Sequence, residues 1–192
     1  GPQGFSGGKV IEAMVSHLDL YPTLCDLAGA DKPDRLEGVS LLPLVAGDAE
    51  TVREEVHAEI NYHAAYEPTR CVRTERYKYT RYFEEREAPV LANVDGGPSK
   101  KRWLQAGWRR EPAGEGLYDL LFDPREAHNL RDDPAYAEVL EDMRGRLHQW
   151  MEATDDELLT GRIPAPPDAQ LNAVEATHSR QEVRTAADLG YA

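Results

Sequence analysis

The sequence predicts an α+β fold in which about four antiparallel strands form a sheet covered by one long helix. Residues 56–63 alternate in polarity with a period of two, as expected for a half-buried strand. Residues 71–74 and 77–83 flank the polar pair Glu75-Arg76, which predicts a β-hairpin. Residues 133–150 carry apolar side chains at helical spacing, which predicts a helix that docks on this sheet.

The covering helix has the clearest start signal in the chain. Asp133 is suited to the N-cap and Pro134 to the first helical position. The apolar stripe consists of Tyr136, Leu140, Met143, Leu147 and Trp150. Burial of each such side chain stabilises by about 1.5–3 kcal/mol, so this stripe must face a partner layer. The fourth strand is predicted at residues 117–122, where Asp123-Pro124 ends it.

The ends and the middle of the chain carry weaker signals. A glycine-rich loop covers residues 1–10, and a short apolar stretch at residues 10–17 predicts a strand. Asp19 and Gly29 bracket a predicted helix. Residues 84–116 have little periodicity and predict a long loop, which is usually functional or disordered. Residues 159–192 contain three prolines and many polar residues, and predict an extended tail.

Composition excludes several classes of function. The 192 residues include 22 Lys+Arg and 35 Asp+Glu, a net charge of −13, which disfavours nucleic acid as the main partner. No apolar run is long enough to span a membrane. Two cysteines exclude a disulfide framework, and no CxxC zinc motif is present. The first residues contain no signal peptide, which leaves the compartment open.

Positive charge is concentrated in residues 70–110, which we call the basic segment. It holds eleven Lys/Arg and five acidic residues, a net +6, whereas the rest of the chain holds eleven Lys/Arg and thirty acidic residues. A local cationic surface can attract an anionic ligand even when the whole protein is anionic. The alternative is a solvated hairpin with ordinary surface charges.

The residues show no complete catalytic constellation. His57, Glu59, Asn61 and His63 share one side of a strand, but its rise places the two histidines roughly 20 Å apart, so one metal ion cannot bind both. His63, at the strand's end, can still reach a pocket. Cys71 lies in a predicted strand near Arg70 and Arg73, where a structural role is favoured over a nucleophilic one.

Four segments, in order, resemble the sulfatase family of the alkaline-phosphatase-like superfamily. Residues 15–29 (VSHLDLYPTLCDLAG) are similar to the family's VxHxDLxPTLxxLAG, and residues 36–44 (LEGVSLLPL) to its GxSLxPL. Residues 70–79 (RCVRTERYKY) resemble its RxVRTxxYKY hairpin, and residues 117–130 resemble LYDLxxDPxExxNL. Residues 66–70 (YEPTR) and 150–156 (WMEATDD) resemble the heparan N-sulfatase (sulfamidase) branch.

The resemblance implies a C-terminal portion of a hydrolase that cleaves sulfate esters or sulfamates of an anionic sugar or aryl substrate. Residues 1–50 then form the edge of an alkaline-phosphatase-like α/β domain, residues 51–158 a C-terminal subdomain and residues 159–192 the tail. The family uses calcium and a formylglycine made in a C/S-x-P-x-R motif, which this chain lacks. Nucleophile and metal ligands therefore lie upstream, and we expect this chain alone to be inactive and to bind no cofactor.

In the complete enzyme, the resemblance places the C-terminal subdomain along the substrate cleft. The residues expected to bind a sulfated small molecule or glycan are His63, Tyr66, Arg70, Asn93, Asp95, Ser99 and Lys100. Arg70 or Lys100 can pair with a sulfate or carboxylate. Two alternatives remain: a phosphodiesterase or phosphonate-ester hydrolase of the same superfamily, and a non-catalytic module that binds anionic glycans. Formation of a homo-oligomer also stays open.

Overall fold

The computed structural model describes residues 7–84, 86, 89–107, 114–181 and 183–192. The chain divides into two compact units. One consists of Gly1–Val56 with Arg73–Arg76, and the other of His57–Val72 with Tyr77–Ala192. In the described part of the chain, no helix has the length and apolar character needed to cross a membrane.

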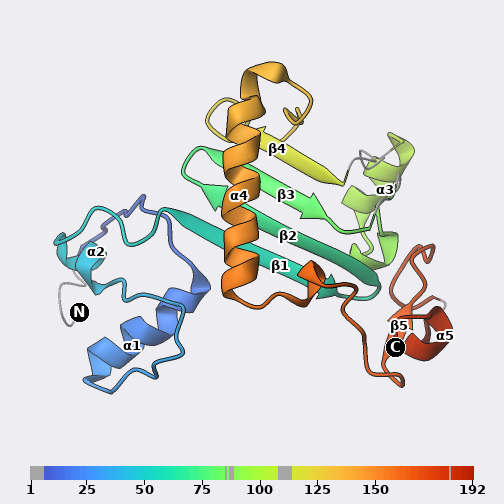
Figure 1. Ribbon diagram of the computed structural model, residues 1–192, viewed down its shortest axis with the longest axis horizontal. Coiled ribbons are helices and arrows are strands. Elements are labelled where there is room, and N and C mark those ends of the chain that lie inside the picture. The colour runs from blue at the N-terminus through green and yellow to red at the C-terminus, as the bar shows by residue number, and fades with distance from the viewer. Residues whose placement is uncertain (1–6, 85, 87–88, 108–113, 182) are drawn as a thin grey trace. The chain divides into compact units, whose positions relative to one another are not determined.

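A four-stranded sheet forms the centre of the second unit (Figure 1). Its strands are adjacent in sequence order, and β3 pairs with β4 antiparallel, with Tyr79 opposite Leu117. The strands are β1 (Glu55–Tyr62), β2 (Tyr66–Thr74), β3 (Tyr77–Tyr82) and β4 (Glu115–Asp119). The predicted four-stranded sheet is therefore confirmed.

Helix α4 (Ala137–Ala153) lies across one face of this sheet (Figure 1). A 3-10 turn, Pro134–Tyr136, precedes it, and the Asp133 carboxylate accepts a hydrogen bond from the Ala135 N–H at 2.9 Å. The predicted start signal and apolar stripe are both confirmed. The core between the layers joins Val72, Tyr79 and Leu117 of the strands to Leu140, Met143, Leu147 and Met151 of the helix.

His57, in the polar row of β1, packs against α4. The His57 ring stacks on the Trp150 ring, with centroids 4.7 Å apart and planes 4° apart. Ile60, on the opposite row, is exposed. The alternation of residues in β1 would lead us to expect an apolar side chain against the helix. Stacking on Trp150 allows His57 to take that position.

Two helical segments lie where the sequence predicted a long loop. Helix α3 (Pro98–Gln105) follows Gly97 with proline in its first turn, and a 3-10 turn covers Leu91–Asn93. Proline at this position is compatible with a helix because its missing N–H needs no partner there. The prediction was wrong because α3 is mostly polar and its one buried residue is Lys100. Residues 85, 87–88 and 108–113 of the expected loop lie outside the described residues.

The expected tail also contains regular structure. Strands β5 (Gln170–Asn172) and β6 (Val183–Thr185) pair antiparallel, and helix α5 (Ala186–Leu189) follows; a 3-10 turn, Glu157–Leu159, comes before them. Small side chains such as Ala165, Ala176 and Ala186 are buried here. A hydrophobic core made largely of alanine gives little hydropathy signal, which is why the sequence suggested an extended tail.

The first unit contains α1 (Leu20–Ala28) and α2 (Leu42–Ala46). Gly29 ends α1 in the left-handed conformation, as predicted. The predicted strand at residues 10–17 is absent, because the described residues offer it no neighbouring strand. Asp19 occupies the predicted N-cap, but its carboxylate accepts instead from the Ser16 N–H (2.7 Å), the Val39 N–H (2.9 Å) and Arg53 Nε (3.1 Å).

Candidate functional site

The turn between β1 and β2 is held rigidly by Asn93. Its Oδ1 accepts hydrogen bonds from the backbone N–H groups of Ala64 (2.9 Å) and Ala65 (2.8 Å). Its Nδ2 donates to the Ala65 carbonyl (3.2 Å) and to Glu67 Oε2 (2.9 Å). All the hydrogen-bonding capacity expected of this amide is used on the turn. Asn93 therefore fixes the position of the neighbouring His63 rather than offering itself to a ligand.

Lys100 fixes the segment that carries Asn93. Its ammonium is buried and donates to the carbonyl oxygens of Leu91 (2.6 Å), Val94 (2.9 Å) and Thr177 (2.6 Å). Two of these carbonyls flank Asn93, and the third belongs to the C-terminal segment. Three acceptors satisfy the three donors of an ammonium group. Lys100 thus joins α3, the Asn93 turn and the C-terminal segment.

An aromatic cluster forms beside the turn. Tyr66 is buried and its ring lies 4.7 Å from that of Tyr62 and 4.9 Å from that of Tyr191. The Tyr62 hydroxyl donates to the Ile163 carbonyl at 2.7 Å, and burial raises the pKa of Tyr62 to about 12. Burial also raises the pKa of Tyr66. Both phenols therefore stay neutral at physiological pH and act as packing groups and hydrogen-bond donors.

Arg162 covers this cluster and was not predicted from the sequence. Its guanidinium carbon lies 5.4 Å from the Tyr66 ring centre and 5.2 Å from that of Tyr191. Nη2 donates to Glu84 Oε1 at 2.8 Å, and 48% of the side chain remains exposed. Cation–π contacts of this kind hold a guanidinium in place without covering all its donors. Arg162 lies in residues 159–192, which we predicted to be an extended tail, and no local sequence pattern identifies it as a binding residue.

Arg70 is almost completely buried within the second unit. Its Nε donates to Asp156 Oδ2 at 2.5 Å and its Nη2 to Asp156 Oδ1 at 3.1 Å. Its Nη1 donates to Asn61 Oδ1 (2.8 Å) and to the Thr69 and Ile60 carbonyls (3.0 and 3.2 Å). Burial raises the pKa of Asp156, but the hydrogen bonds from Arg70 and the Leu158 N–H outweigh it and hold the pKa below its usual range. The pair is charged and joins β2 to the segment after α4.

The seven predicted binding residues thus separate into two groups. Tyr66, Arg70, Asn93 and Lys100 build the framework, whereas His63, Asp95 and Ser99 are exposed. The hydrogen bonds above bring the turn after His63 together with the Asn93 and Lys100 segments. Asp95 and Ser99 lie on the same connecting segment and at the start of α3.

The basic segment is not one open cationic surface. Besides the buried Arg70 and Lys100, Lys78 pairs with Glu126 at 2.6 Å and Arg86 with Glu84 at 3.6 Å. Arg109 and Arg110 lie outside the described residues. Much of the charge excess counted along the sequence therefore serves internal contacts.

The residues present do not fit a calcium ion or a formylglycine. Within the described ranges, no three or more His, Cys, Asp or Glu side chains gather closely enough to hold a metal. Neither Cys25 nor Cys71 is followed by the proline and arginine that formylglycine formation requires in the family.

Comparison with known proteins decides the family. The family model described as "N-sulphoglucosamine sulphohydrolase, C-terminal" matches residues 1–106, more than half of the chain. The chain belongs to the sulfatase family. An ulvan-active sulfatase of Formosa agariphila is 31% identical over 86% of this sulfatase chain. Human N-sulphoglucosamine sulphohydrolase is 29% identical over 78% of it.

The solved structures agree with the fold. A 2-O GAG sulfatase aligns with a TM-score of 0.58 and 30% identity, covering 85% of the sulfatase chain and 31% of its own length. The chain spans 34% of the Formosa agariphila protein and 34% of the human protein. The family, predicted from the sequence motifs, and the α+β architecture, predicted from the periodicity of the strands and the covering helix, are therefore both confirmed.

Proposed function

We propose that the complete protein hydrolyses sulfate esters or sulfamates of an anionic sugar, and that this chain forms one wall of the substrate cleft. The observation that carries the proposal is the match between residues 1–106 and the sulfatase C-terminal model. The relatives that share this region include a sulfatase named for ulvan and one named for N-sulphoglucosamine. A negatively charged sugar is the substrate class that these names have in common.

The β1–β2 turn supports the proposed role. It presents the exposed His63 from a backbone fixed by Asn93, and Arg162 lies over the neighbouring Tyr66. Binding groups that are held in place before the ligand arrives lose little conformational entropy on binding. A guanidinium can donate two parallel hydrogen bonds to a sulfate or carboxylate. We assign sugar or sulfate recognition to His63 and Arg162, with Asp95 and Ser99 as further polar contacts.

The first unit supports a larger enzyme. It exposes a series of large apolar side chains, among them Leu18, Leu20, Tyr21 and Leu24 on and just before α1. Exposed apolar surface of this kind usually marks a contact with another protein region. We propose that residues 1–50 form the edge of the α/β catalytic domain and that residues 51–158, with the segment 159–192, form the C-terminal subdomain.

The catalytic groups then come from sequence outside this chain. Sulfatases are a family with a formylglycine nucleophile and a calcium ion, and the side chains described above suit neither. We therefore propose that the 192-residue chain releases no sulfate by itself. Its contribution to the reaction is the binding and orientation of the anionic sugar.

The test uses the protein expressed from its complete coding sequence. We expect sulfate release from a sulfated amino sugar, and a higher KM with little change in kcat for His63→Ala and Arg162→Ala. Arg125→Ala, an exposed arginine on the loop after β4, is the matched control and should leave KM unchanged. Absence of sulfate release would refute the proposal. Phosphodiester or phosphonate-ester hydrolysis, or glycan binding without hydrolysis, would then be the functions to measure.

A further inference from the structure

The ring of Tyr191, in the C-terminal segment, is held in place by the backbone that carries it. Helix α5 ends at Gly190, which takes the left-handed conformation (φ 74°) and reverses the chain. The Tyr191 N–H then donates to the Ala186 carbonyl at 2.9 Å, and the Tyr191 carbonyl accepts from the Ala165 N–H at 2.7 Å. Ala165 and Ala186 are both buried. The backbone of Tyr191 is therefore fixed from two sides, which sets the position of its ring.

Tyr191 and Tyr66 together support the Arg162 guanidinium. The two ring centres are 4.9 Å apart, and the guanidinium carbon lies 5.2 Å from the centre of Tyr191 and 5.4 Å from that of Tyr66. Cation–π attraction needs an aromatic face within about 6 Å, and both rings meet this condition. Because the two distances are nearly equal, Tyr191 is as well placed as Tyr66 to hold the cation.

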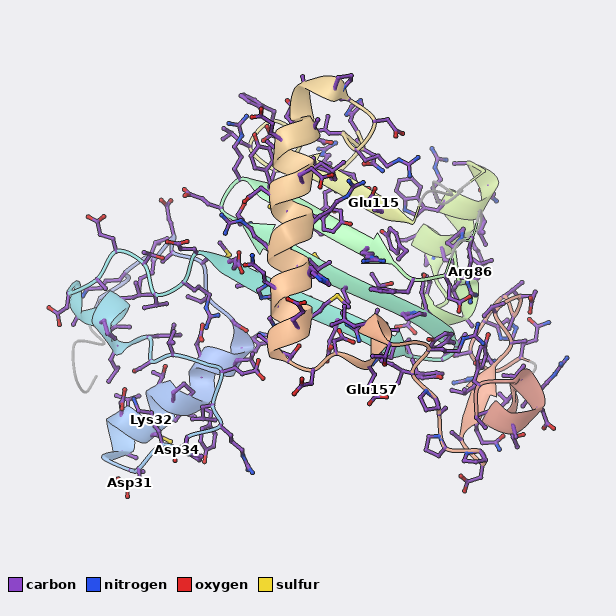
Figure 2. All side chains as sticks on the ribbon, in the orientation of Figure 1. Asp31, Lys32, Asp34, Arg86, Glu115 and Glu157 are labelled. Atoms are coloured by element: carbon purple, nitrogen blue, oxygen red, sulfur yellow. The ribbon has the colours of Figure 1, made fainter. Side chains whose placement is uncertain are left out.

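The Arg162 guanidinium keeps donors and positive charge for a ligand. Its Nη2 donates to Glu84 Oε1 at 2.8 Å, whereas Nε and Nη1 donate no hydrogen bond to a residue that the structure describes. Glu84 Oε2 also lies 3.6 Å from Nη2 of Arg86, which Figure 2 labels. One carboxylate is thus shared by two guanidinium groups. Glu84 orients Arg162 but only partly neutralises it.

The second ring matters because an arginine side chain has many rotamers and must lose most of them to present a fixed edge. Glu84 is 28% exposed, and ion pairs that solvent reaches hold their partners weakly. One cation–π contact at an exposed site raises the population of the held conformer by about two- to fivefold. Without Tyr191, only Tyr66 and this weak ion pair would remain to hold Arg162.

We propose that Tyr191 is a positioning residue, whose ring holds the Arg162 guanidinium in the orientation that binds the anionic group of the sugar. The inference rests on the proposed function, which assigns recognition of that group to Arg162. It makes substrate affinity depend on residues 186–192, which lie outside the region that matches the family model. Since the ring acts through its π face, the Tyr191 hydroxyl is not required.

Steady-state kinetics of the complete protein test this role, with a glucosamine that carries one N-sulfate and one O-sulfate group as substrate. Tyr191→Leu keeps an apolar side chain against Tyr66 but has no π face, and we expect KM to rise about two- to fivefold with kcat unchanged. Tyr191→Phe keeps the π face and should retain the wild-type KM. Leu189→Ala is the matched control, because Leu189 packs in the same segment but is not among the described contacts of Arg162.

A second measurement follows Arg162 without catalysis. In the complete protein with isotope-labelled arginine, the Nε–Hε NMR signal of Arg162 is identified by its loss in Arg162→Lys. Its heteronuclear NOE should fall in Tyr191→Leu and stay unchanged in Tyr191→Phe and Leu189→Ala.

The outcomes separate the inference from the proposed function. An unchanged NOE or KM in Tyr191→Leu, or an equal rise of KM in Leu189→Ala, would overturn the inference. If Arg162→Ala raises KM and Tyr191→Leu does not, only the inference fails. If the wild-type protein releases no sulfate, the proposed function fails, and the NOE still decides whether Tyr191 holds Arg162.

Discussion

The ion pair between Arg70 and Asp156 gives the sharpest test of how this fold is held together. Both side chains are buried, at 1% and 4% exposure, and two hydrogen bonds join them. In Asp156→Ala, the guanidinium keeps Asn61, two carbonyl acceptors and the exposed Glu59 carboxylate at 3.5 Å, but it loses its buried counter-charge. Removing one partner of such a pair costs about 3–5 kcal/mol. This is a large share of the roughly 5–15 kcal/mol that stabilises a typical domain.

Urea unfolding, monitored by circular dichroism, measures this loss of stability. With a denaturant slope of about 1–3 kcal/mol per M, a loss of about 3–5 kcal/mol should lower the midpoint by about 1–5 M. Asp142→Ala is the matched control, because Asp142 pairs with Arg146 at 2.8 Å on the exposed side of α4. Exposed pairs of this kind contribute about 0.3–0.5 kcal/mol. A loss below about 1 kcal/mol in Asp156→Ala would refute the reasoning.

A double variant separates charge burial from packing. Replacing both partners, as in Arg70→Met with Asp156→Leu, removes the pair without leaving a charge behind, and buried pairs replaced this way are often neutral or stabilising. The double variant should therefore be more stable than Asp156→Ala alone. If it is equally unstable, the segment after α4 depends on the shape of this contact and not on its electrostatics.

The same pair predicts the pH dependence. The pKa of Asp156 is lower in the folded protein than in the unfolded chain, so the unfolded chain binds the proton more tightly. The stability from Asp156 is present in full above the unfolded pKa of about 3.9 and is lost as pH falls through the folded pKa. The difference in unfolding free energy between the wild type and Asp156→Ala should therefore shrink below about pH 4.

Three further substitutions test other parts of the framework. Gly38→Ala places a Cβ against the Leu18 carbonyl oxygen, and we expect a loss of at least about 1–3 kcal/mol, seen as a lower melting temperature; an unchanged melting temperature would contradict it. Lys100→Met leaves three carbonyl oxygens without their donor. Each carbonyl that water cannot reach should lower the stability of the folded chain by about 1–3 kcal/mol. Amide hydrogen exchange should therefore become faster in α3 and near Thr177. Asn93→Ala should expose the Ala64 and Ala65 amides to exchange, whereas Asn93→Asp, which keeps the acceptor, should protect them; equal exchange in the two variants would argue against the clamp.

The parts of the fold that sequence predicts are those held by apolar periodicity and local caps. Helix α4 is an example, because Asp133 caps the 3-10 turn that leads into it and its buried side chains recur at the helical period. The hairpin of β2 and β3 is another, since its strands flank one polar turn. Both signals depend on neighbours in sequence and need no knowledge of the rest of the molecule.

The parts that sequence misses are held by single polar contacts across long separations. Helix α3 docks through the buried ammonium of Lys100, which reaches Thr177, 77 residues away. The pairing of β5 with β6 buries Leu171 among small residues such as Ala165 and Ala186, which is too little apolar surface to form a hydropathy pattern. Neither contact has a sequence period, so only the three-dimensional structure brings its partners together.

The same distinction applies to the binding residues. A count of charges selected Arg70 and Lys100, but their guanidinium and ammonium groups are buried against protein acceptors. The arginine available to a ligand, Arg162, lies on an aromatic ring and keeps exposed surface. A cation needs both a support that fixes it and solvent that reaches it before it can select an anion. Net charge along a segment reports neither property, so the search for anion-binding residues in this family must start from the contacts of each cation.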